Sequence, residues 1–226
     1  MKSYSQHKED VVAQEILAKL NVENGFYIDV GASHPINDST TYALYERGFR
    51  GICIEPQPHH AIQHRELRPL DIFIPVLAGA EFGIQTLHLL HAEQLATASA
   101  ATLEWWSMPK PGGVGPHSHS MGRMEAPCVP LNAVMEKYRL PAIHFLSLDV
   151  EGFEGEVFKG FDLAKYRPWI ICAEAVLPWS SIRNDANWYQ YVIGSGYTEV
   201  HFDGYNRFFV ANEFNPRPAQ NSVPSG

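Results

Sequence analysis

The sequence predicts an α/β protein with a mostly parallel sheet, helices on both of its faces and an antiparallel hairpin near the C-terminal end. Three observations predict this class. Short apolar runs alternate with segments whose apolar residues recur at helical spacing, which is the order of a parallel sheet. Two of those runs stop on acids, Asp149 and Glu174, and a third, at 26–32, carries Asp29 and ends in the glycine turn of Gly31. An apolar strand followed by a glycine turn typically begins a nucleotide-binding βα unit.

The first half of the chain is expected to begin with a leading helix at 8–20, which Asn24-Gly25 separates from the strand at 26–32. Residues 38–40 are good N-cap residues for a helix that reaches Arg47 and ends at Gly48. The further elements expected in this half are a strand at 51–55, a helix at 58–68, a strand at 71–78, an extra strand at 85–90 and a helix around 92–106.

The second half begins with a segment at 107–122 that is too rich in Pro and Gly to hold regular structure. We expect a flexible loop there, and we favour a functional lid over a disordered spacer because structured segments flank it. The elements expected beyond it are an extended segment at 124–130, helices at 131–138, 152–159 and 187–193, strands at 143–149 and 169–174, and a hairpin of 197–202 with 208–211. The prediction is a single domain over 1–214 and a frayed tail at 215–226.

The composition is that of a chain able to bury a sizeable core, since its 226 residues are 45% hydrophobic and 12% aromatic. The 17 Lys and Arg residues against 25 Asp and Glu give a net charge of −8, which opposes binding to nucleic acid and suits a cationic ligand. Cys53, Cys128 and Cys172 form no Cys-x-x-Cys pair, so we expect buried free thiols. No signal peptide or membrane-spanning stretch is evident, which predicts a cytoplasmic protein without a transmembrane segment.

Acids at strand ends are the candidate functional residues. The apolar run at 143–149 ends on Asp149 and is followed by Glu151 and Glu154. Because ligands of open α/β sheets bind at the carboxyl ends of the strands, these acids are candidates for contact with a ligand. Glu55 ends the strand at 51–55, about two dozen residues after Gly31. Nucleotide-binding folds place at that distance the acid that accepts hydrogen bonds from a ribose diol.

Taken together, the motifs resemble the FkbM family of S-adenosylmethionine-dependent O-methyltransferases, especially members associated with glycan and polysaccharide modification. The matching elements are Tyr4-Ser5-Gln6 with Glu9-Asp10, Tyr27-Ile28-Asp29-Val30-Gly31-Ala32, Ser39-Thr40-Thr41 with Tyr45-Glu46-Arg47-Gly48, Gly51-Ile52-Cys53-Ile54-Glu55-Pro56, Asp149-Val150-Glu151-Gly152-Phe153-Glu154 and Asp203-Gly204-Tyr205-Asn206-Arg207. The likeness runs from about Tyr4 to Ala211 and implies a Rossmann-like class I methyltransferase fold. The glycine-rich turn of many methyltransferases is reduced here to Gly31-Ala32-Ser33-His34-Pro35.

The resemblance implies a binding site for S-adenosylmethionine. Asp29 is expected to orient the turn or reach the amino group of the cofactor, Gly31 to let the backbone approach it, and Glu55 to accept hydrogen bonds from the ribose hydroxyls. The residues that complete the expected cofactor site by family likeness are Gln6, Asp10, Ala32, Ser39, Thr41 and Asp149. From the residues alone, Gln6, Asp10, Ser39 and Thr41 also read as polar surface or a helix cap.

Methyl transfer to a hydroxyl needs alignment of the reacting atoms and a base that takes the proton. The candidate bases are Asp149 first, then Glu151, Glu174 and His201. Asp149 and Glu174 end successive strands, so they could instead hold Mg²⁺ or another divalent cation that lowers the pKa of a sugar hydroxyl. Stabilisation of a helix N-terminus is an alternative explanation of Glu151 and Glu154.

The expected acceptor is a hydroxyl of a sugar in a glycan, polysaccharide or glycolipid, and a homo-oligomer is compatible with the sequence. Trp105 and Trp106 could stack on a sugar face or pack as part of a helix, and Trp179 and Trp188 are equally ambiguous. For His117 and His119, a place in a polar loop is a better explanation than metal binding. Two other functions stay open: a non-catalytic carbohydrate- or partner-binding domain, and an NAD-dependent oxidoreductase, against which the missing glycines argue.

Overall fold

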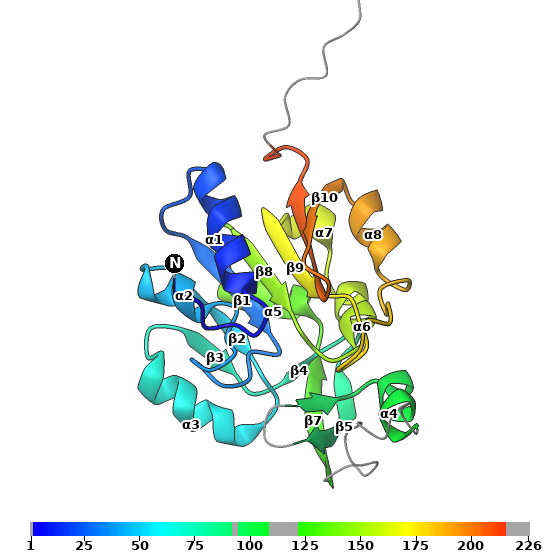
Figure 1. Cartoon of the computed structure of the whole chain (residues 1–226). Helices are drawn as coiled ribbons and strands as arrows, with labels where there is room; N and C mark the ends of the chain where they lie inside the picture. The colour runs from blue at the N-terminus through cyan, green and yellow to red at the C-terminus, as the bar shows by residue number, and fades with distance from the viewer. Residues whose placement is uncertain (1, 92–94, 109–121, 216–226) are drawn as a thin grey trace, which may run out of the picture.

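A seven-stranded sheet forms the centre of the computed structural model, which describes residues 2–91, 95–108 and 122–215 (Figure 1). The strands, in spatial order, are β10 (Tyr197–Phe202), β11 (Asn206–Ala211), β9 (Ile170–Glu174), β8 (Phe145–Leu148), β1 (Phe26–Val30), β2 (Arg50–Ile54) and β3 (Ile72–Ile74). From β9 to β3 every neighbouring pair is parallel, whereas β11 is antiparallel to both β9 and β10. The mostly parallel sheet and the C-terminal hairpin predicted from the sequence are confirmed.

Helices cover both faces of this sheet. The helices that contribute to the packing on one face are α1 (Glu9–Lys19), α2 (Tyr42–Glu46) and α3 (Pro58–Leu67), and those on the other are α5 (Leu131–Tyr138), α6 (Glu154–Lys159), α7 (Leu163–Tyr166) and α8 (Tyr189–Gly194). Successive side chains of a strand point to opposite faces, so Tyr27 belongs to the first core and Ile28 to the second. Because both faces are covered, the strands read as continuous apolar runs rather than as alternating ones.

A second, four-stranded sheet was not predicted. It consists, in spatial order, of β4 (Leu77–Ala78), β7 (Gly122–Val129), β5 (Gly83–His91) and β6 (Leu95–Thr97), and it lies next to the main sheet in Figure 1. The single strand expected at 71–78 is wrong, because the chain bends after β3 and gives β4 to this second sheet. The helix expected around 92–106 is wrong at 95–97, where β6 pairs with β5, and its residues 92–94 lie outside the described part of the chain. Only α4 (Ala100–Ser107) is helical, and the Ser99 side chain caps it.

Two smaller differences concern the start of one helix and the presence of another. The helix expected from 38–40 begins only at Tyr42, because Asp38 has a φ of +59° and lies outside the helical region. The Ser39 hydroxyl still accepts a hydrogen bond from the amide of Tyr42. The short helix α7, whose N-cap is Asp162, was not predicted.

The expected flexible loop at 107–122, with His117 and His119, and the tail at 215–226 lie almost entirely outside the described residues.

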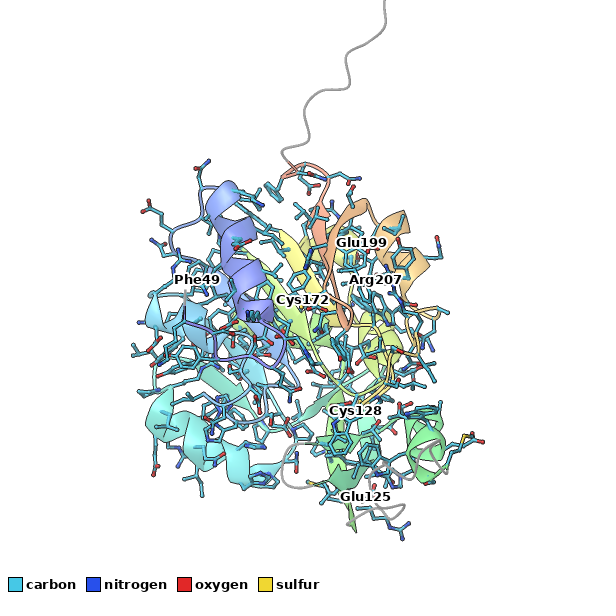
Figure 2. All side chains as sticks on the ribbon, viewed as in Figure 1. Phe49, Glu125, Cys128, Cys172, Glu199 and Arg207 are labelled. Carbon is cyan, nitrogen blue, oxygen red and sulfur yellow. The ribbon has the colours of Figure 1, made fainter. Side chains whose placement is uncertain are left out.

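The three cysteines are buried free thiols, as the sequence predicted. Cys172 lies in the main sheet and Cys128 in the second sheet, as Figure 2 shows, while Cys53 belongs to β2. Among the described residues, no helix combines the length and the apolar character that crossing a bilayer requires.

Candidate active site

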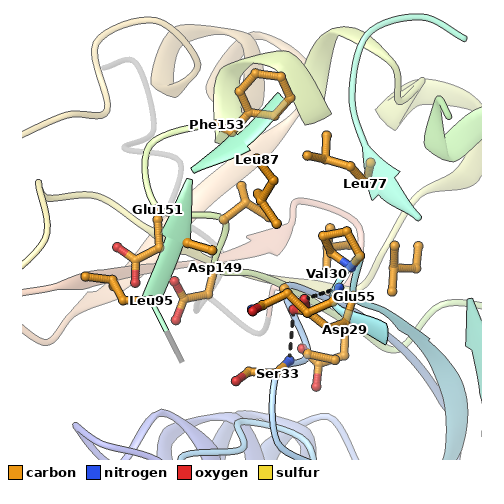
Figure 3. Close-up of a pocket in the computed structure, with 18 of the residues that line it drawn as sticks. Asp29, Val30, Ser33, Glu55, Leu77, Leu87, Leu95, Asp149, Glu151 and Phe153 are labelled. Atoms are coloured by element: carbon orange, nitrogen blue, oxygen red, sulfur yellow. Dashed lines mark hydrogen bonds between the residues drawn. The ribbon is translucent and has the colours of Figure 1, made fainter. Parts of the chain in front are cut away.

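The strand order reverses beside β1. From β1 the sheet continues to β2 and β3 on one side, while the later strands β8 and β9 lie on the other. In open α/β sheets such a reversal opens a crevice at the carboxyl ends of the strands, where ligands bind. A cavity of about 280 Å³ lies at this position, between the ends of β1, β2 and β8 and residues of the second sheet (Figure 3). We take it as the candidate active site.

Gly31 joins the end of β1 to the cavity. Its φ is +82°, and a Cβ at this position would lie 1.7 Å from the backbone oxygen of Asp149. The sequence predicted that this glycine lets the backbone approach a ligand; in the structure, an added Cβ would in addition clash with the neighbouring strand end. Glycine is therefore required here for both backbone conformation and close approach of the β1 and β8 ends.

Asp29 lines the cavity but is only 4% exposed. The hydroxyl of Thr41 donates a hydrogen bond of 2.5 Å to Asp29 Oδ2. Burial raises the pKa of Asp29, while the charge of Arg68 and the bond from Thr41 act in the opposite direction. Thr41 does not line the cavity, so it acts by holding Asp29.

Arg68 is a supporting residue that the sequence analysis missed. Its guanidinium is buried and donates to Asp71 Oδ2 (2.8 Å), to the Tyr27 hydroxyl (2.6 Å) and to Thr41 Oγ1 (2.9 Å). A basic residue at a helix C-terminus is usually interpreted as a partner of the helix dipole, so no local pattern signals this role. Through Thr41, the Arg68 network fixes the carboxylate of Asp29 at the cavity wall.

Glu55 follows directly after β2 and lines the cavity, with 5% of its surface exposed. Its Oε1 accepts a hydrogen bond from the amide of Gln57 (2.8 Å) and its Oε2 from the amide of Ser33 (3.3 Å; Figure 3). Burial raises the pKa of Glu55, and the two amides act against that rise. The carboxylate is thus fixed in one orientation, with lone pairs left to accept hydrogen bonds from a ligand.

The N-terminal segment brings Gln6 to the cavity. Asp10 does not line it, and instead accepts hydrogen bonds from Ser3 Oγ, the Tyr4 amide and Ser5 Oγ, which order this segment. Other predicted residues that do line the cavity are Ala32 and Ser39.

The second sheet supplies an apolar wall that the sequence analysis missed. Its residues at the cavity are Leu77, Ala78, Leu87, Leu95 and Ala96, and Phe153 adds to them from the segment before α6. Strands of two or three residues give too weak a sequence pattern to predict this wall.

Trp179 also lines the cavity, although 63% of its surface is exposed. Its φ of +53° is rare for a bulky residue. Its ring centroid lies 5.3 Å from that of Trp106, which is buried. Of the other two tryptophans considered for a sugar contact, Trp188 packs in the core, and Trp105 donates a hydrogen bond to the backbone oxygen of Pro178. Of the tryptophans considered from the sequence, Trp179 is therefore the one that lines the cavity.

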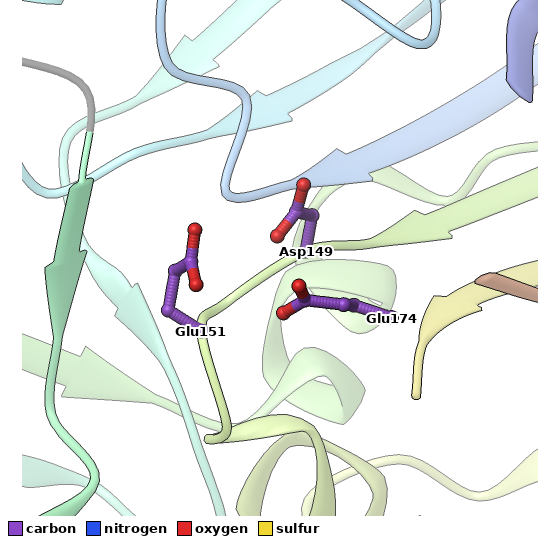
Figure 4. A group of neighbouring side chains, drawn as sticks. All are labelled: Asp149, Glu151 and Glu174. Atoms are coloured by element: carbon purple, nitrogen blue, oxygen red, sulfur yellow. The ribbon is translucent and has the colours of Figure 1, made fainter. Parts of the chain in front are cut away.

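Three carboxylates meet on the opposite side of the cavity from Glu55. Asp149 follows β8, Glu151 lies in the next turn, and Glu174 ends β9. Each offers one oxygen, and these oxygens lie within 4.8 Å of one another (Figure 4). Asp149 and Glu151 line the cavity directly, and Glu174 stands behind them.

Glu154 has a different role from these three. Its Oε1 accepts hydrogen bonds from the amides of Val150 (3.1 Å) and Gly152 (3.2 Å), so it shapes the turn after β8. This turn gives Glu151 a φ of +54°. Burial raises the pKa of Glu154 to about 7, against the effect of these amides.

Burial and mutual repulsion raise the pKa values of the three carboxyl groups. Although Asp149 as a whole is exposed, desolvation of its carboxyl group first, and then the charge of Glu154, raises its pKa to about 7. The pKa of Glu151 and that of Glu174 are raised well above their ordinary value, again by burial first and then by the neighbouring acids. A base whose pKa is close to the operating pH is well suited to proton transfer.

His201 is not brought to the cavity. It lies on the edge strand β10, opposite Phe208, and lines a separate hollow beside α1 with Val12 and Ile16. The strands β11, β9 and β8 lie between it and β1. We therefore leave His201 out of the candidate site, because the edge position of its strand separates it from the other predicted residues.

The fold and the cavity define an α/β protein with a cavity of small-molecule size at the carboxyl edge of a parallel sheet, and carboxylates line this cavity. The sequence model of the methyltransferase FkbM domain matches residues 29–202. The chain belongs to this methyltransferase family, as its motifs predicted.

One solved structure is similar to this chain at the level of the fold. The chain is similar to the crystal structure of methyltransferase FkbM from Methylobacillus flagellatus KT, with a TM-score of 0.51 and 13% sequence identity. The match covers 83% of this chain and 44% of that one, so the chain spans less than half the length of this structural neighbour. A comparison with curated proteins gave no significant match.

Proposed function

We propose that this protein is an S-adenosylmethionine-dependent O-methyltransferase whose acceptor is a sugar hydroxyl of a glycan, polysaccharide or glycolipid. The observation that carries the proposal is Glu55, a carboxylate fixed by two backbone amides at the cavity wall. Membership of a methyltransferase family supports the methyl transfer. The sugar is supported by the chemistry of the cavity, which is lined by two carboxylates, Asp149 and Glu151, and by an exposed tryptophan, Trp179.

The cofactor would lie between β1 and β2. The two hydroxyls of its ribose are donors that match the free lone pairs of Glu55. Asp29 suits a positively charged amino group, because its carboxylate is held in place by Thr41 and is buried at the end of β1. Gln6 and Ser39 complete this side, and the apolar wall of the second sheet suits a planar base. Asp10 and Thr41 would act by positioning these residues.

The proposed reaction needs one base from the protein. The acceptor oxygen bonds to the methyl carbon as the carbon–sulfur bond breaks, its electrons go to sulfur, and the hydroxyl proton passes to a carboxylate. Asp149 is the first candidate because it faces the cavity and its pKa of about 7 suits a base at neutral pH. Glu151, and Glu174 behind it, are the further candidates.

The acceptor would enter beside these carboxylates. A sugar presents hydroxyl donors around its rim and apolar C–H groups on its faces. Carboxylates can accept hydrogen bonds from the hydroxyls, and an aromatic ring can pack against the C–H face. Trp179 supplies the ring, and Asp149 and Glu151 supply the acceptors.

Replacing Glu55 by Ala should weaken binding of S-adenosylmethionine and S-adenosylhomocysteine by roughly 10–100-fold, because two hydroxyls lose a charged acceptor. Calorimetric titration of both ligands measures this change, with NAD as a control ligand. Glu66→Ala, on the exposed surface of α3, is the matched control and should bind as the wild type does. Unchanged affinity in folded Glu55→Ala would remove the ribose assignment. Binding of NAD in place of both ligands would instead favour an oxidoreductase.

Replacing Trp179 by Ala should raise the KM for the sugar acceptor about 3- to 10-fold, the equivalent of one aromatic contact of ~0.5–1.5 kcal/mol. The acceptor is first found by offering methyl glycosides and nucleotide sugars with S-adenosylmethionine that carries a labelled methyl group. The affinity for the cofactor should stay unchanged, and Trp179→Phe should retain most of the acceptor affinity. An unchanged KM in Trp179→Ala would exclude this contact, while acceptor binding without any label transfer would point to a non-catalytic domain.

A further inference from the structure

The convergence of Asp149, Glu151 and Glu174 has a consequence beyond base catalysis. We infer that these three carboxylates form a site for a hard divalent cation, Mg²⁺ or Mn²⁺, on the acceptor side of the cavity. They come from the end of β8, from the turn that follows it and from the end of β9, and their ligand oxygens lie within 4.8 Å of one another (Figure 4). One cation can contact all three oxygens at the ~2.0–2.6 Å typical of such ions.

The second observation is a lack of hydrogen-bond donors. Oε2 of Glu151 and Oε2 of Glu174 are both buried, and neither has a hydrogen-bond partner among the described residues. Within the described residues 2–91, 95–108 and 122–215, no Lys, Arg or His forms an ion pair with Asp149, Glu151 or Glu174. A buried carboxylate without a partner is costly, so such groups normally pair or bind metals.

Neighbouring acids differ from Glu151 and Glu174 in this respect. Glu154 accepts from two backbone amides, and Glu55 also accepts from two. Asp29 accepts from Thr41, and Glu9 accepts from the Asn206 side chain (3.1 Å) and the His7 amide (2.8 Å). The fold thus satisfies the acids around the cavity wherever they serve the structure. It leaves one buried oxygen each of Glu151 and Glu174 without a hydrogen-bond partner among the described residues, and both of these acids belong to the converging group.

The chemistry of the ligands indicates the kind of cation. All three are carboxylate oxygens, and no His or Cys belongs to the group. Oxygen-only sites favour Mg²⁺, Mn²⁺ or Ca²⁺ over Zn²⁺, which prefers nitrogen and sulfur. Mg²⁺ usually keeps several waters and binds through a few carboxylates, so three protein oxygens leave positions for water and for an acceptor hydroxyl.

The catalytic role of the cation rests on the proposed function. The binding of the cation to the three carboxylates does not depend on that function. A hydroxyl bound to a divalent cation has a lower pKa, so its proton passes more readily to a carboxylate oxygen that does not bind the metal. Cation binding also displaces protons from the ligand carboxylates and offsets their mutual repulsion. Transfer to a sugar hydroxyl would then be faster with Mg²⁺ than in EDTA.

The test is a titration of the purified chain with Mn²⁺ at pH 8, followed by the loss of the free-ion signal in electron paramagnetic resonance, with Mg²⁺ as competitor. We expect one saturable site per chain that Mg²⁺ displaces. Glu151→Gln and Glu174→Gln should each weaken it at least 10-fold. Glu66→Gln, an exposed residue of α3, should leave it unchanged.

Folding of each variant is checked by circular dichroism and by titration with S-adenosylmethionine. The absence of saturable Mn²⁺ binding to folded wild-type protein, or equal binding to Glu174→Gln, would overturn the inference. If the cofactor binds while Mn²⁺ does not, the cation site fails and the proposed function stands. If Mn²⁺ binds while the cofactor does not, the proposed function fails and the cation site stands.

Discussion

Asp149→Asn is expected to lower turnover by about 10²–10⁴-fold, the contribution of a positioned base to proton transfer. Asn keeps the size of the side chain and can hydrogen-bond to an acceptor hydroxyl, but it cannot take the proton at neutral pH. Binding of S-adenosylmethionine should change little, because Glu55 and Asp29 remain. Rates come from single-turnover transfer of a labelled methyl group at saturating cofactor, with Glu66→Gln as the control.

The pH dependence of the wild type gives a second readout of the same residue. The pKa of Asp149 is raised to about 7, so the carboxylate is protonated below this value and active as a base above it. Activity in EDTA should therefore rise as the pH is raised through about 7, and this rise should be absent from the residual rate of Asp149→Asn. Saturating Mg²⁺ should move the rise to lower pH, because a bound cation favours the ionised carboxylates. A variant with wild-type turnover would exclude Asp149 as the base.

The parts of the fold that the sequence predicted well are those with a local pattern. The helix at 131–138 is confirmed with its bounds unchanged, and the strands at 26–32 and 169–174 are confirmed within two residues of their predicted ends. The second sheet was missed because its edge strands β4 and β6 are two and three residues long. Strands this short are held by pairing with distant partners, which a single sequence does not reveal.

The same distinction applies to the candidate site. Four site residues were predicted together at one edge of the sheet, because the carboxyl ends of parallel strands meet there regardless of the loops that follow. The structure places all four at the cavity: Asp29, Gly31, Glu55 and Asp149. Arg68 and Trp179 were not assigned to it, because their roles depend on contacts between segments far apart in sequence. For His201, the pattern gave the strand but not its place at the edge of the sheet.

Gly31→Ala is expected to cost about 2–5 kcal/mol of the free energy of unfolding and to abolish cofactor binding. A side chain at a φ of +82° costs about 1–2 kcal/mol by itself. The added Cβ would also lie 1.7 Å from the backbone oxygen of Asp149, so the ends of β1 and β8 would have to separate. Thermal unfolding should show a decrease in Tm on the order of 10 °C for a chain of this size.

Two other glycines separate the causes of this loss. Gly48 has a φ of +98° with nothing within 4 Å of an added Cβ, so Gly48→Ala should show the conformational cost alone and retain cofactor binding. Gly83 has neither a positive φ nor a neighbour within 4 Å, so Gly83→Ala should be close to neutral. If Gly31→Ala unfolds no more easily than Gly48→Ala and still binds S-adenosylmethionine, the contact between Gly31 and Asp149 does not hold the site together. A loss of both properties in Gly31→Ala alone would show that this contact couples the cofactor side of the cavity to the carboxylates that face the acceptor.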